Sequence, residues 1–416
     1  MLKKTQISIA ASIIAVSTSS LAVADQISPN PNYGTIHLSS SSEVYENYLA
    51  PFENFGSIFI HPNASLLNYG DLQNNVGGQL WLLGDSPSDA LTVIKNLGSL
   101  SNAGFMYLGY DAEISGGGSI NNSGDLYAYN SGNMSSSSIN NSGFFYSSFE
   151  LNSSVITNSG FFVGSGAVFS ETLTNSGDFY SSSVLESSVI TNSGFFDGAS
   201  SYMSAKTFTN SGTFKNTGYF RNQDEYEESS PDLKYTQTNG QTINHGQIEF
   251  LSIEILGGSL SGTGTLVGDV NIGSSATVMP GSSPGTLNID GDLHSNGNYV
   301  FEIAGLNSGQ YDVLDIDGNA FFTGGNFKFD FIDGFLPSTG DHWDFLMADS
   351  LNGLESVNFT FAGLSGGLGI DLSTEGGKIS LTVITAVPEP ETYAMLLAGL
   401  GLMSFMSYRR KQQKAA

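Results

Sequence analysis

The chain has no cysteine and few basic residues. Without cysteine no disulfide can form, so packing and backbone hydrogen bonds must hold the fold together. Between residues 25 and 390, seven Lys and Arg residues stand against 38 Asp and Glu residues, which gives this part a net charge of −31. A surface of this sign repels nucleic acid, so we expect no nucleic-acid partner.

Sequence motifs for catalysis are also scarce. The five histidines, at positions 37, 61, 245, 294 and 342, are scattered, and no G-x-S-x-G, H-E-x-x-H or phosphate-loop motif occurs. Hydrolysis of polysaccharides needs two carboxyl groups at a set separation, and the sequence shows no motif that would supply such a pair. The sequence therefore predicts no enzymatic activity and no cofactor.

Two acidic segments are weak candidates for calcium binding. Residues 290–292 (Asp-Gly-Asp) and 315–318 (Asp-Ile-Asp-Gly) offer carboxylate oxygens, and Asp315 and Asp317 are the candidates that we retain. Both segments lack the twelve-residue ligand spacing of an EF-hand loop. Asp-Gly is also a common turn-forming pair, so the alternative is a structural turn, and we predict no metal site.

The chain is rich in glycine and aromatic residues, with 51 Gly, 28 Phe and 18 Tyr. So many aromatic residues argue against disorder. An Asn-Ser-Gly triplet recurs three times at intervals of 17 residues, with intervals of 19 before and 18 after this run. The triplets begin at Asn122, Asn141, Asn158, Asn175, Asn192 and Asn210. Looser N-x-G copies that we assign to the same frame begin at Asn54, Asn68, Asn96, Asn102 and Asn244.

A fixed period of about 20 residues, in a chain rich in Gly, Ser, Asn and Phe, predicts an all-β solenoid rather than a helical repeat. We predict a parallel β-solenoid (β-helix) of ~17-residue repeats over residues 25–256, with coils stacked about 4.8 Å apart. In such a fold the asparagines form a ladder of amide hydrogen bonds, glycine permits a tight corner, and Phe stacks inside. The alternative is an antiparallel β-sandwich or barrel whose hairpin turns carry the triplets.

Residues 257–386 form a second segment, in which short apolar alternations are separated by glycine turns. It contains G-x-L-x-G-x-G at 258–264, P-G-x-S-P-G-x-L-x-I at 280–289 and Y-D-x-L-x-I-x-G at 311–318. These motifs resemble a segment that follows repeats in bacterial autotransporter-like and PEP-CTERM surface proteins. We expect this β-rich module to continue or cap the solenoid, because an open end would leave edge strands unpaired.

Residues 1–24 have the pattern of a secretory signal peptide. Lys3 and Lys4 precede an apolar run over residues 7–16, and Ala22 and Ala24 form an A-x-A cleavage site before Asp25. The alternative is an N-terminal transmembrane anchor, for which the apolar run is too short. We therefore predict export, with Asp25 as the first residue of the mature protein.

Residues 387–416 combine three parts in order: a Pro-Glu-Pro motif, an uncharged apolar run over residues 393–408, and a basic tail. The motif comprises Val387, Pro388, Glu389 and Pro390, and the tail begins with Arg409 and Arg410. The run predicts a single transmembrane helix with the tail on the cytoplasmic side. This arrangement resembles the PEP-CTERM sorting signal of Gram-negative, biofilm-forming bacteria, which implies processing by an exosortase. The alternative is a plain C-terminal membrane anchor.

These signals together predict an exported protein of a Gram-negative bacterium. We expect an inner-membrane intermediate, held transiently by the C-terminal helix, and then a location on the cell surface or in the extracellular matrix. The predicted function is non-catalytic and structural or adhesin-like, with exopolysaccharide or other matrix components as partners. Aromatic and amide rows on a flat sheet suit sugars, which offer hydroxyls and apolar ring faces. The alternative is an extracellular polysaccharide-active β-helix enzyme.

Overall fold

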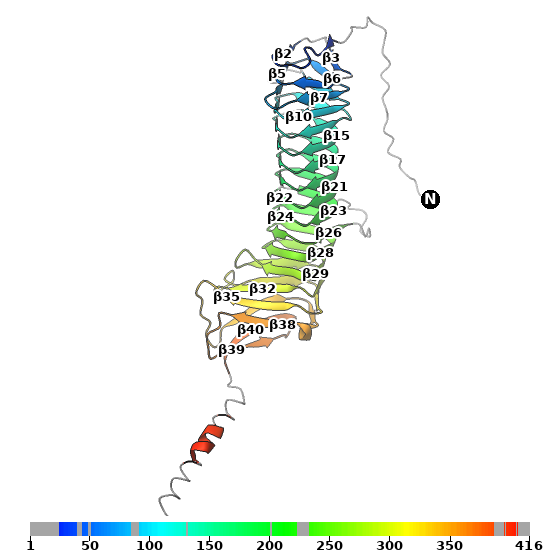
Figure 1. Ribbon diagram of the computed structural model, residues 1–416. Helices are drawn as coiled ribbons and strands as arrows, with labels where there is room; N and C mark the ends of the chain where they lie inside the picture. The colour runs from blue at the N-terminus through cyan, green and yellow to red at the C-terminus, as the bar shows by residue number, and fades with distance from the viewer. Residues whose placement is uncertain are drawn as a thin grey trace, which may run out of the picture.

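The strands stack along one axis, so the molecule is an elongated rod (Figure 1). The computed structural model describes residues 25–386 except 40–43, 49–50, 85–90, 130–131, 200–201 and 223–232, and it also describes residues 395, 397–404 and 406. Strand β2 (Thr35–Leu38) lies at one end of the rod and β39 (Leu368–Ser373) at the other. Almost all strand pairs are parallel, which identifies the fold as a parallel β-solenoid and shows that the antiparallel sandwich is wrong.

In the N-terminal part each coil has three strands on three faces. From β2 to β12 each strand pairs with the strand three places later, and β1 pairs with β3. Face A contains β1 (Asp25–Gln26), β3 (Val44–Asn47), β6 (Ser65–Asn68), β9 (Thr92–Asn96) and β12 (Ala112–Ser115). Face B contains β4 (Phe52–Asn54), β7 (Asp71–Asn74), β10 (Ser99–Asn102) and β13 (Ser119–Asn122). Face C contains β2, β5 (Ser57–Ile60), β8 (Gln79–Leu82), β11 (Phe105–Leu108) and β14 (Asp125–Ala128).

From residue 134 one longer strand per coil serves both face A and face B. These strands are β15 (Met134–Asn141), β17 (Leu151–Asn158), β19 (Val168–Asn175), β21 (Val184–Asn192) and β23 (Tyr202–Asn210). Face C continues in β16 (Phe144–Ser147), β18 (Phe161–Gly164), β20 (Asp178–Ser181), β22 (Phe195–Gly198) and β24 (Thr213–Asn216). The next coil again has three short strands, β25 (Tyr219–Asn222), β26 (Lys234–Gln237) and β27 (Gln241–Asn244).

The parallel pairing of strands continues without a break through residues 256 and 257, where the repeat region of the sequence gives way to the Gly-rich segment. Both lie inside β28 (Gln247–Gly262), which follows all three faces and pairs with β29 (Thr265–Pro280), with register shifts near the corners. The remaining parallel coils contain β30 (Thr286–Asp290), β31 (Leu293–Ser295), β32 (Asn298–Ile303), β33 (Val313–Asp317), β34 (Asn319–Phe322), β35 (Asn326–Phe331), β36 (His342–Met347), β37 (Ser350–Asn352), the 3₁₀ helix η1 (Leu354–Ser356) and β38 (Asn358–Ala362).

Two antiparallel pairs close the C-terminal end of the solenoid. Strand β40 (Lys378–Thr385) pairs antiparallel with both β36 and β39. Its inward side chains Ile379, Leu381 and Val383 are buried, as is Trp343 of β36. The edge of β36 is therefore covered, whereas β37 and β38 pair only with the preceding coil.

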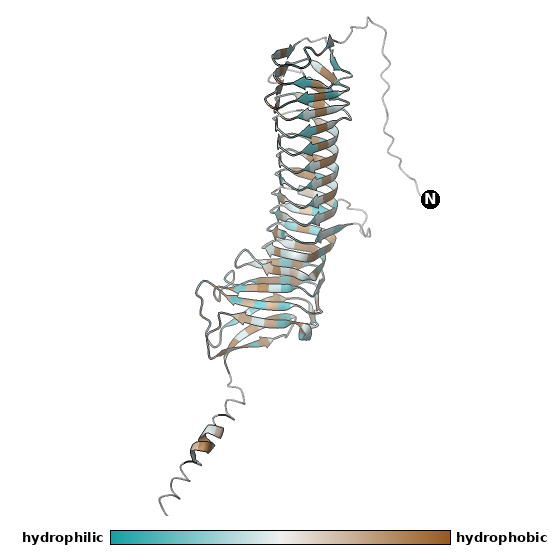
Figure 2. Cartoon of the chain, in the orientation of Figure 1, coloured by the Kyte–Doolittle hydropathy of each residue, from teal (hydrophilic) through white to brown (hydrophobic). Residues whose placement is uncertain are grey.

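Alternation of inward and outward side chains builds the core. Most short strands have the burial pattern intermediate–buried–intermediate–buried, as expected where one face of a sheet meets the core. Apolar residues recur at the same place in successive strands (Figure 2), so they form columns along the rod. In one such column Phe145, Phe162 and Phe179 stack with ring centroids 4.7 Å apart.

The predicted period of ~17 residues holds only in the middle of the rod. The asparagines of the ladder are 17 residues apart between Asn141 and Asn192, but 18 to 28 residues apart elsewhere. A solenoid fixes the register of its strands but lets the corners between faces vary in length, so the spacing can change while the column stays straight.

The targeting segments lie largely outside the described residues. This applies to Ala22, Ala24, Val387, Pro388, Glu389, Pro390, Arg409 and Arg410, whereas Asp25 begins β1. Residues 397–404 are helical and fall within the predicted transmembrane helix 393–408, whose two ends are not described. In the part of the chain that the structure describes, no helix is both long enough and apolar enough to span a bilayer.

Candidate functional site

A column of ten asparagines runs inside the rod at the corner between faces B and C. Each side-chain Nδ2 donates to the Oδ1 of the asparagine in the next coil, at 2.7 or 2.8 Å. The column comprises Asn32, Asn54, Asn74, Asn102, Asn122, Asn141, Asn158, Asn175, Asn192 and Asn210. All ten are buried, so the structure places the six predicted ladder asparagines in one structural column away from solvent.

The other two residues of the triplet also have defined roles at this corner. The backbone N–H of Ser176 donates to the backbone oxygen of Asn158 at 2.8 Å, and its Oγ donates to the same oxygen at 3.3 Å. A Cβ on Gly177 would lie 2.2 Å from the backbone oxygen of Gly160 in the previous coil, which leaves no room for a side chain. The triplet therefore fixes the stacking of coils and is a structural motif.

The looser N-x-G copies do not all belong to this column, which corrects their assignment to one frame. Asn68 and Asn96 form a second ladder with Asn47 at the corner between faces A and B. Asn244 pairs with Asn216 at the end of face C, whereas the register position after Asn210 is taken by Gln237. An asparagine side chain can form these coil-to-coil hydrogen bonds at any corner, so an N-x-G motif does not by itself indicate which corner it occupies.

Face C carries a continuous row of aromatic side chains on its outer surface, which we call the aromatic strip. Successive rings lie 4.9 to 6.1 Å apart between centroids. The strip comprises Phe59, Trp81, Phe105, Tyr107, Tyr127, Tyr129, Phe144, Tyr146, Phe161, Tyr180 and Phe195. All are partly exposed, at most 39% at Tyr129, and the strip spans eight coils from β5 to β22.

The rings of the strip are arranged differently from those of the core. Inside, Phe145, Phe162 and Phe179 stack at interplanar angles of 9° and 7°. Outside, most neighbouring rings are tilted by 35 to 47°. A tilted ring covers only part of its neighbour's face, so the strip leaves part of its π surface open to a ligand.

A polar groove of about 350 Å³ runs along the edge of the strip, at the corner between faces B and C. Four of its lining residues are buried ladder asparagines, namely Asn74, Asn102, Asn122 and Asn141. The others are Gln73, Asn75, Ser101, Ala103, Asn121, Ser123, Asn140, Ser142, Thr157 and Ser159, and all of these except Ala103 have amide or hydroxyl side chains. Ser142 and Ser159 precede Phe144 and Phe161 of the strip by two residues, so groove and strip are neighbours. On the groove wall, Asn140 Nδ2 donates to Asn121 Oδ1 at 2.9 Å.

The charged side chains on the outer surface of face C are all acidic from β5 to β22. Asp125 and Asp178 are exposed and occupy the same outward register column as Phe144 and Phe161. No Lys or Arg stands at an outward position of face C from β5 to β22, all of which the structure describes. Burial raises the pKa of the Tyr180 hydroxyl, and the charges of Asp178 and Asp197 add to this effect.

Sequence reasoning anticipated aromatic and amide rows but not the strip or the groove as sites. The signal was nevertheless present in the sequence. After five of the six triplets a buried Phe lies four residues beyond the asparagine, and after the first triplet this residue is Leu126. The residues at positions three and five point outward, as Phe161 and Val163 do on either side of Phe162. Reading these flanking positions separately would have revealed the aromatic column.

The calcium candidates lie in an open groove of about 520 Å³ near the C-terminal end. Register pairing brings Asp290 beside Asp317, and Asp315 and Asp349 also line this groove. Among the described residues, no group of three or more His, Asp or Glu side chains is placed to hold a metal ion. Asp290, Asp315, Asp317 and Asp349 thus give this groove an acidic surface.

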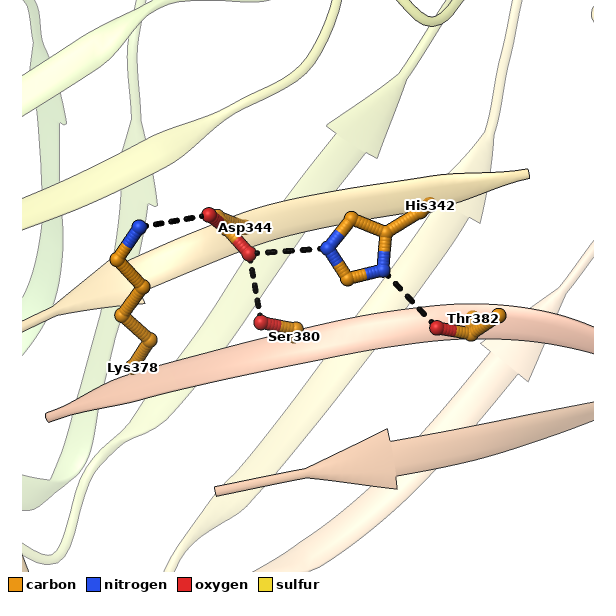
Figure 3. A network of polar contacts seen from close by, with 5 residues as sticks. All are labelled: His342, Asp344, Lys378, Ser380 and Thr382. Carbon is orange, nitrogen blue, oxygen red and sulfur yellow. Dashed lines mark hydrogen bonds and ion pairs between the residues drawn. The ribbon is translucent and has the colours of Figure 1, made fainter. Parts of the chain in front are cut away.

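A polar network on the outer face of β36 and β40 is the arrangement that most resembles a catalytic constellation (Figure 3). His342 Nδ1 lies 2.9 Å from Thr382 Oγ1, and His342 Nε2 lies 3.2 Å from Asp344 Oδ1. Ser380 Oγ donates to Asp344 at 2.6 Å, and Lys378 Nζ donates to it at 2.9 Å. The Ser380 and Lys378 hydrogen bonds hold the pKa of Asp344 below its usual value.

This network has a structural explanation. His342 is the register partner of Thr382, and Asp344 is the partner of Ser380, so the contacts are cross-strand pairs. The side chain of His342 is 54% exposed, and the network lies on an open sheet surface. We interpret it as a clamp that joins the closing strand β40 to the last coil.

Comparison with protein families gives one match. Residues 386–411 match the PEP-CTERM protein-sorting motif. The chain is therefore a parallel β-solenoid that carries a PEP-CTERM sorting motif at its C-terminus, and this motif implies an exported, cell-surface-anchored protein that an exosortase processes. No curated protein matches the chain.

Proposed function

We propose that this protein is a non-catalytic structural or adhesin-like component of the cell surface or extracellular matrix. It passes through an inner-membrane intermediate, and an exosortase processes its C-terminal segment in a Gram-negative host. The rod then presents one long face to matrix polysaccharide. The sorting motif supports the route, and the polar groove beside the aromatic strip supports the binding function.

The groove is the single observation that carries the binding function. Its outward amide and hydroxyl side chains match the donors and acceptors of sugar hydroxyls, and partly exposed rings lie along its edge. These side chains belong to Gln73, Ser101, Asn121, Ser123, Asn140, Ser142, Thr157 and Ser159. Sites that bind sugars combine polar groups that fix orientation with apolar surface that contacts the ring. The groove also spans several coils, which suits a chain-like ligand better than a small molecule.

The sorting part of the proposal is tested by the mass and location of the protein in its native host. We expect a product that lacks the C-terminal segment, found on the surface or in the matrix. A strain without exosortase is expected to retain the full-length form in the inner membrane. Retention of the full-length form in both strains would contradict the proposal.

The binding part is tested with the mature protein and polysaccharide extracted from the host's own matrix. We expect the protein to sediment with the polysaccharide and to release no reducing or unsaturated sugar ends during prolonged incubation. Absence of co-sedimentation would contradict the adhesin-like role. Release of sugar ends would favour a polysaccharide-active enzyme.

A further inference from the structure

We propose that the aromatic strip binds an extended polysaccharide that carries protonated amino groups, with the polymer axis parallel to the rod. This inference rests on the proposed function and names the class of ligand. It is carried by the juxtaposition of tilted exposed rings, two carboxylates within the same row, and the amide-lined groove along the edge of the row.

Charge complementarity selects a cationic polymer. Asp125 and Asp178 interrupt the row of rings, and Lys215 is the first outward basic residue of face C after β22. The net charge of −31 between residues 25 and 390 adds a long-range attraction for cations. An anionic polysaccharide would be repelled by the same field, and a neutral one could donate hydrogen bonds to the carboxylates but would gain no attraction from the net charge.

The rings add a second, short-range attraction for the same ligand. Tyr and Trp rings attract an ammonium group placed over their faces, and the energy rises when the contact is shielded from water. Trp81 is half-buried: Phe59 stacks on it at 21°, whereas Phe105 and Tyr107 are tilted by 45° from it and cover it less completely. An amino sugar therefore offers both a cation for the ring faces and an apolar ring surface of its own.

The repeat of the strip favours a polymer over a second copy of this protein. Eight coils at about 4.8 Å spacing give a strip about 35 Å long, and two outward columns make it about 10 Å wide. Two copies packed face to face would bury roughly 700 Å² in total, below the ~1,200 Å² of a stable interface. Two such rods would also repel each other through their net negative charge.

The groove gives the ligand a fixed orientation on the strip. Asn121 and Asn140 line it next to the coils that carry Tyr127 and Tyr146. A polymer that lies over the rings can direct its hydroxyl and N-acetyl groups into this groove. The rise from coil to coil is close to the length of one hexose ring, so successive sugars meet equivalent surroundings.

The test compares the binding of three soluble polymers to the mature protein at about pH 5.5, which is above the usual pKa of a carboxyl group. The polymers are partially N-acetylated chitosan, hydroxyethyl cellulose and alginate, which are cationic, neutral and anionic. The variant replaces Tyr107, Tyr127 and Tyr146 by Ser, because these three residues are direct register partners in one outward column. The matched control replaces Tyr48 and Tyr69 by Ser, a stacked pair away from face C with ring centroids 5.0 Å apart.

We expect chitosan to bind at least tenfold more tightly than hydroxyethyl cellulose, and alginate not to bind. The triple variant should lose about tenfold or more in chitosan affinity, because three ring contacts are removed. The control should bind as the wild type does. Asp125→Asn with Asp178→Asn should also weaken chitosan binding, and these exposed substitutions keep the inference testable if the triple variant does not fold.

Three results would overturn the inference. Wild-type affinity in the triple variant would mean that net charge alone attracts chitosan. Equal binding of hydroxyethyl cellulose and chitosan would exclude the amino-sugar class but leave the proposed glycan-binding function intact. If no test polymer and no host polysaccharide binds, both this inference and the adhesin-like role fail.

Discussion

At the scale of single residues, the asparagine ladder joins each coil to the next. Asn141 accepts a hydrogen bond from Asn122 and donates one to Asn158, each at 2.8 Å, and its backbone oxygen accepts from Ser159 and Gly160. Because the amides all donate in the same direction along the rod, neighbouring hydrogen bonds polarise one another. The ladder is therefore a continuous element of stability.

Replacing one ladder asparagine should destabilise the protein strongly. Asn141→Ala removes both amide contacts and leaves the buried Oδ1 of Asn158 without its donor, which should cost about 2–4 kcal/mol. The measurement is the midpoint of urea unfolding followed by circular dichroism. Asn140→Ala is the matched control, because Asn140 is adjacent but exposed and should change stability by less than about 0.5 kcal/mol. Equal effects of the two substitutions would contradict this account.

Asp312 is an acidic side chain buried near the C-terminal end. Its two carboxyl oxygens accept hydrogen bonds from the backbone N–H groups of Gly285 and Glu302, each at 2.8 Å. Burial nevertheless raises the pKa of Asp312 from 3.8 to about 7, and the nearby charge of Glu302 adds to the rise. The folded state therefore holds a proton that the unfolded state releases between these two pH values.

Asp312 should thus make the protein less stable as the pH rises from about 4 to about 7. In this range the folded state binds more protons than the unfolded state, so the free energy of unfolding falls with pH. Asp312→Asn cannot titrate and should flatten this part of the profile, whatever its effect on overall stability. The measurement is the urea midpoint at a series of pH values. An unchanged slope in the variant would refute the role assigned to Asp312.

At the scale of elements, the sequence predicted the repeat, the parallel stacking and the inward Phe positions, because each depends on a period that recurs along the chain. It did not predict the three separate asparagine columns, since an N-x-G motif can occupy any corner of a coil. The groove depends on the outward neighbours of the ladder, such as Asn121 and Asn140, whose proximity arises only when coils stack. Only the coil-to-coil register could have shown that they form one wall.

The antiparallel strands β39 and β40 should limit end-to-end association of the rod, because they cover the edge of β36. A chain without residues 1–24 that ends at residue 363 lacks both strands, exposes Trp343 and leaves β36 without its antiparallel partner. We expect this chain to form oligomers or aggregates through its open edge. The control chain ends at residue 386 and keeps both strands. Light scattering after size exclusion measures the masses, and a monomeric truncated chain would contradict the capping role.

At the scale of the whole molecule, the rod carries far more negative than positive charge. Ion pairs seen among the described residues are few and partly exposed, such as Lys215 with Asp197 at 3.6 Å and Lys234 with Glu254 at 2.5 Å. Repulsion between like charges therefore outweighs these pairs, whose contributions are small in water. This excess keeps rods apart in solution and attracts cations to their surface.

Added salt should accordingly stabilise the rod through screening alone. Raising NaCl from about 0.05 M to about 0.5 M shortens the screening length from roughly 14 Å to roughly 4 Å, so carboxylate repulsion weakens and Tm should rise. CaCl₂ at equal ionic strength should give the same Tm, because Asp315 and Asp317 lie in an acidic groove without a metal-binding group. The measurement is the Tm of the mature protein in NaCl and in CaCl₂, by differential scanning calorimetry. A higher Tm in CaCl₂ that Asp315→Asn with Asp317→Asn abolishes would instead show that this groove binds calcium.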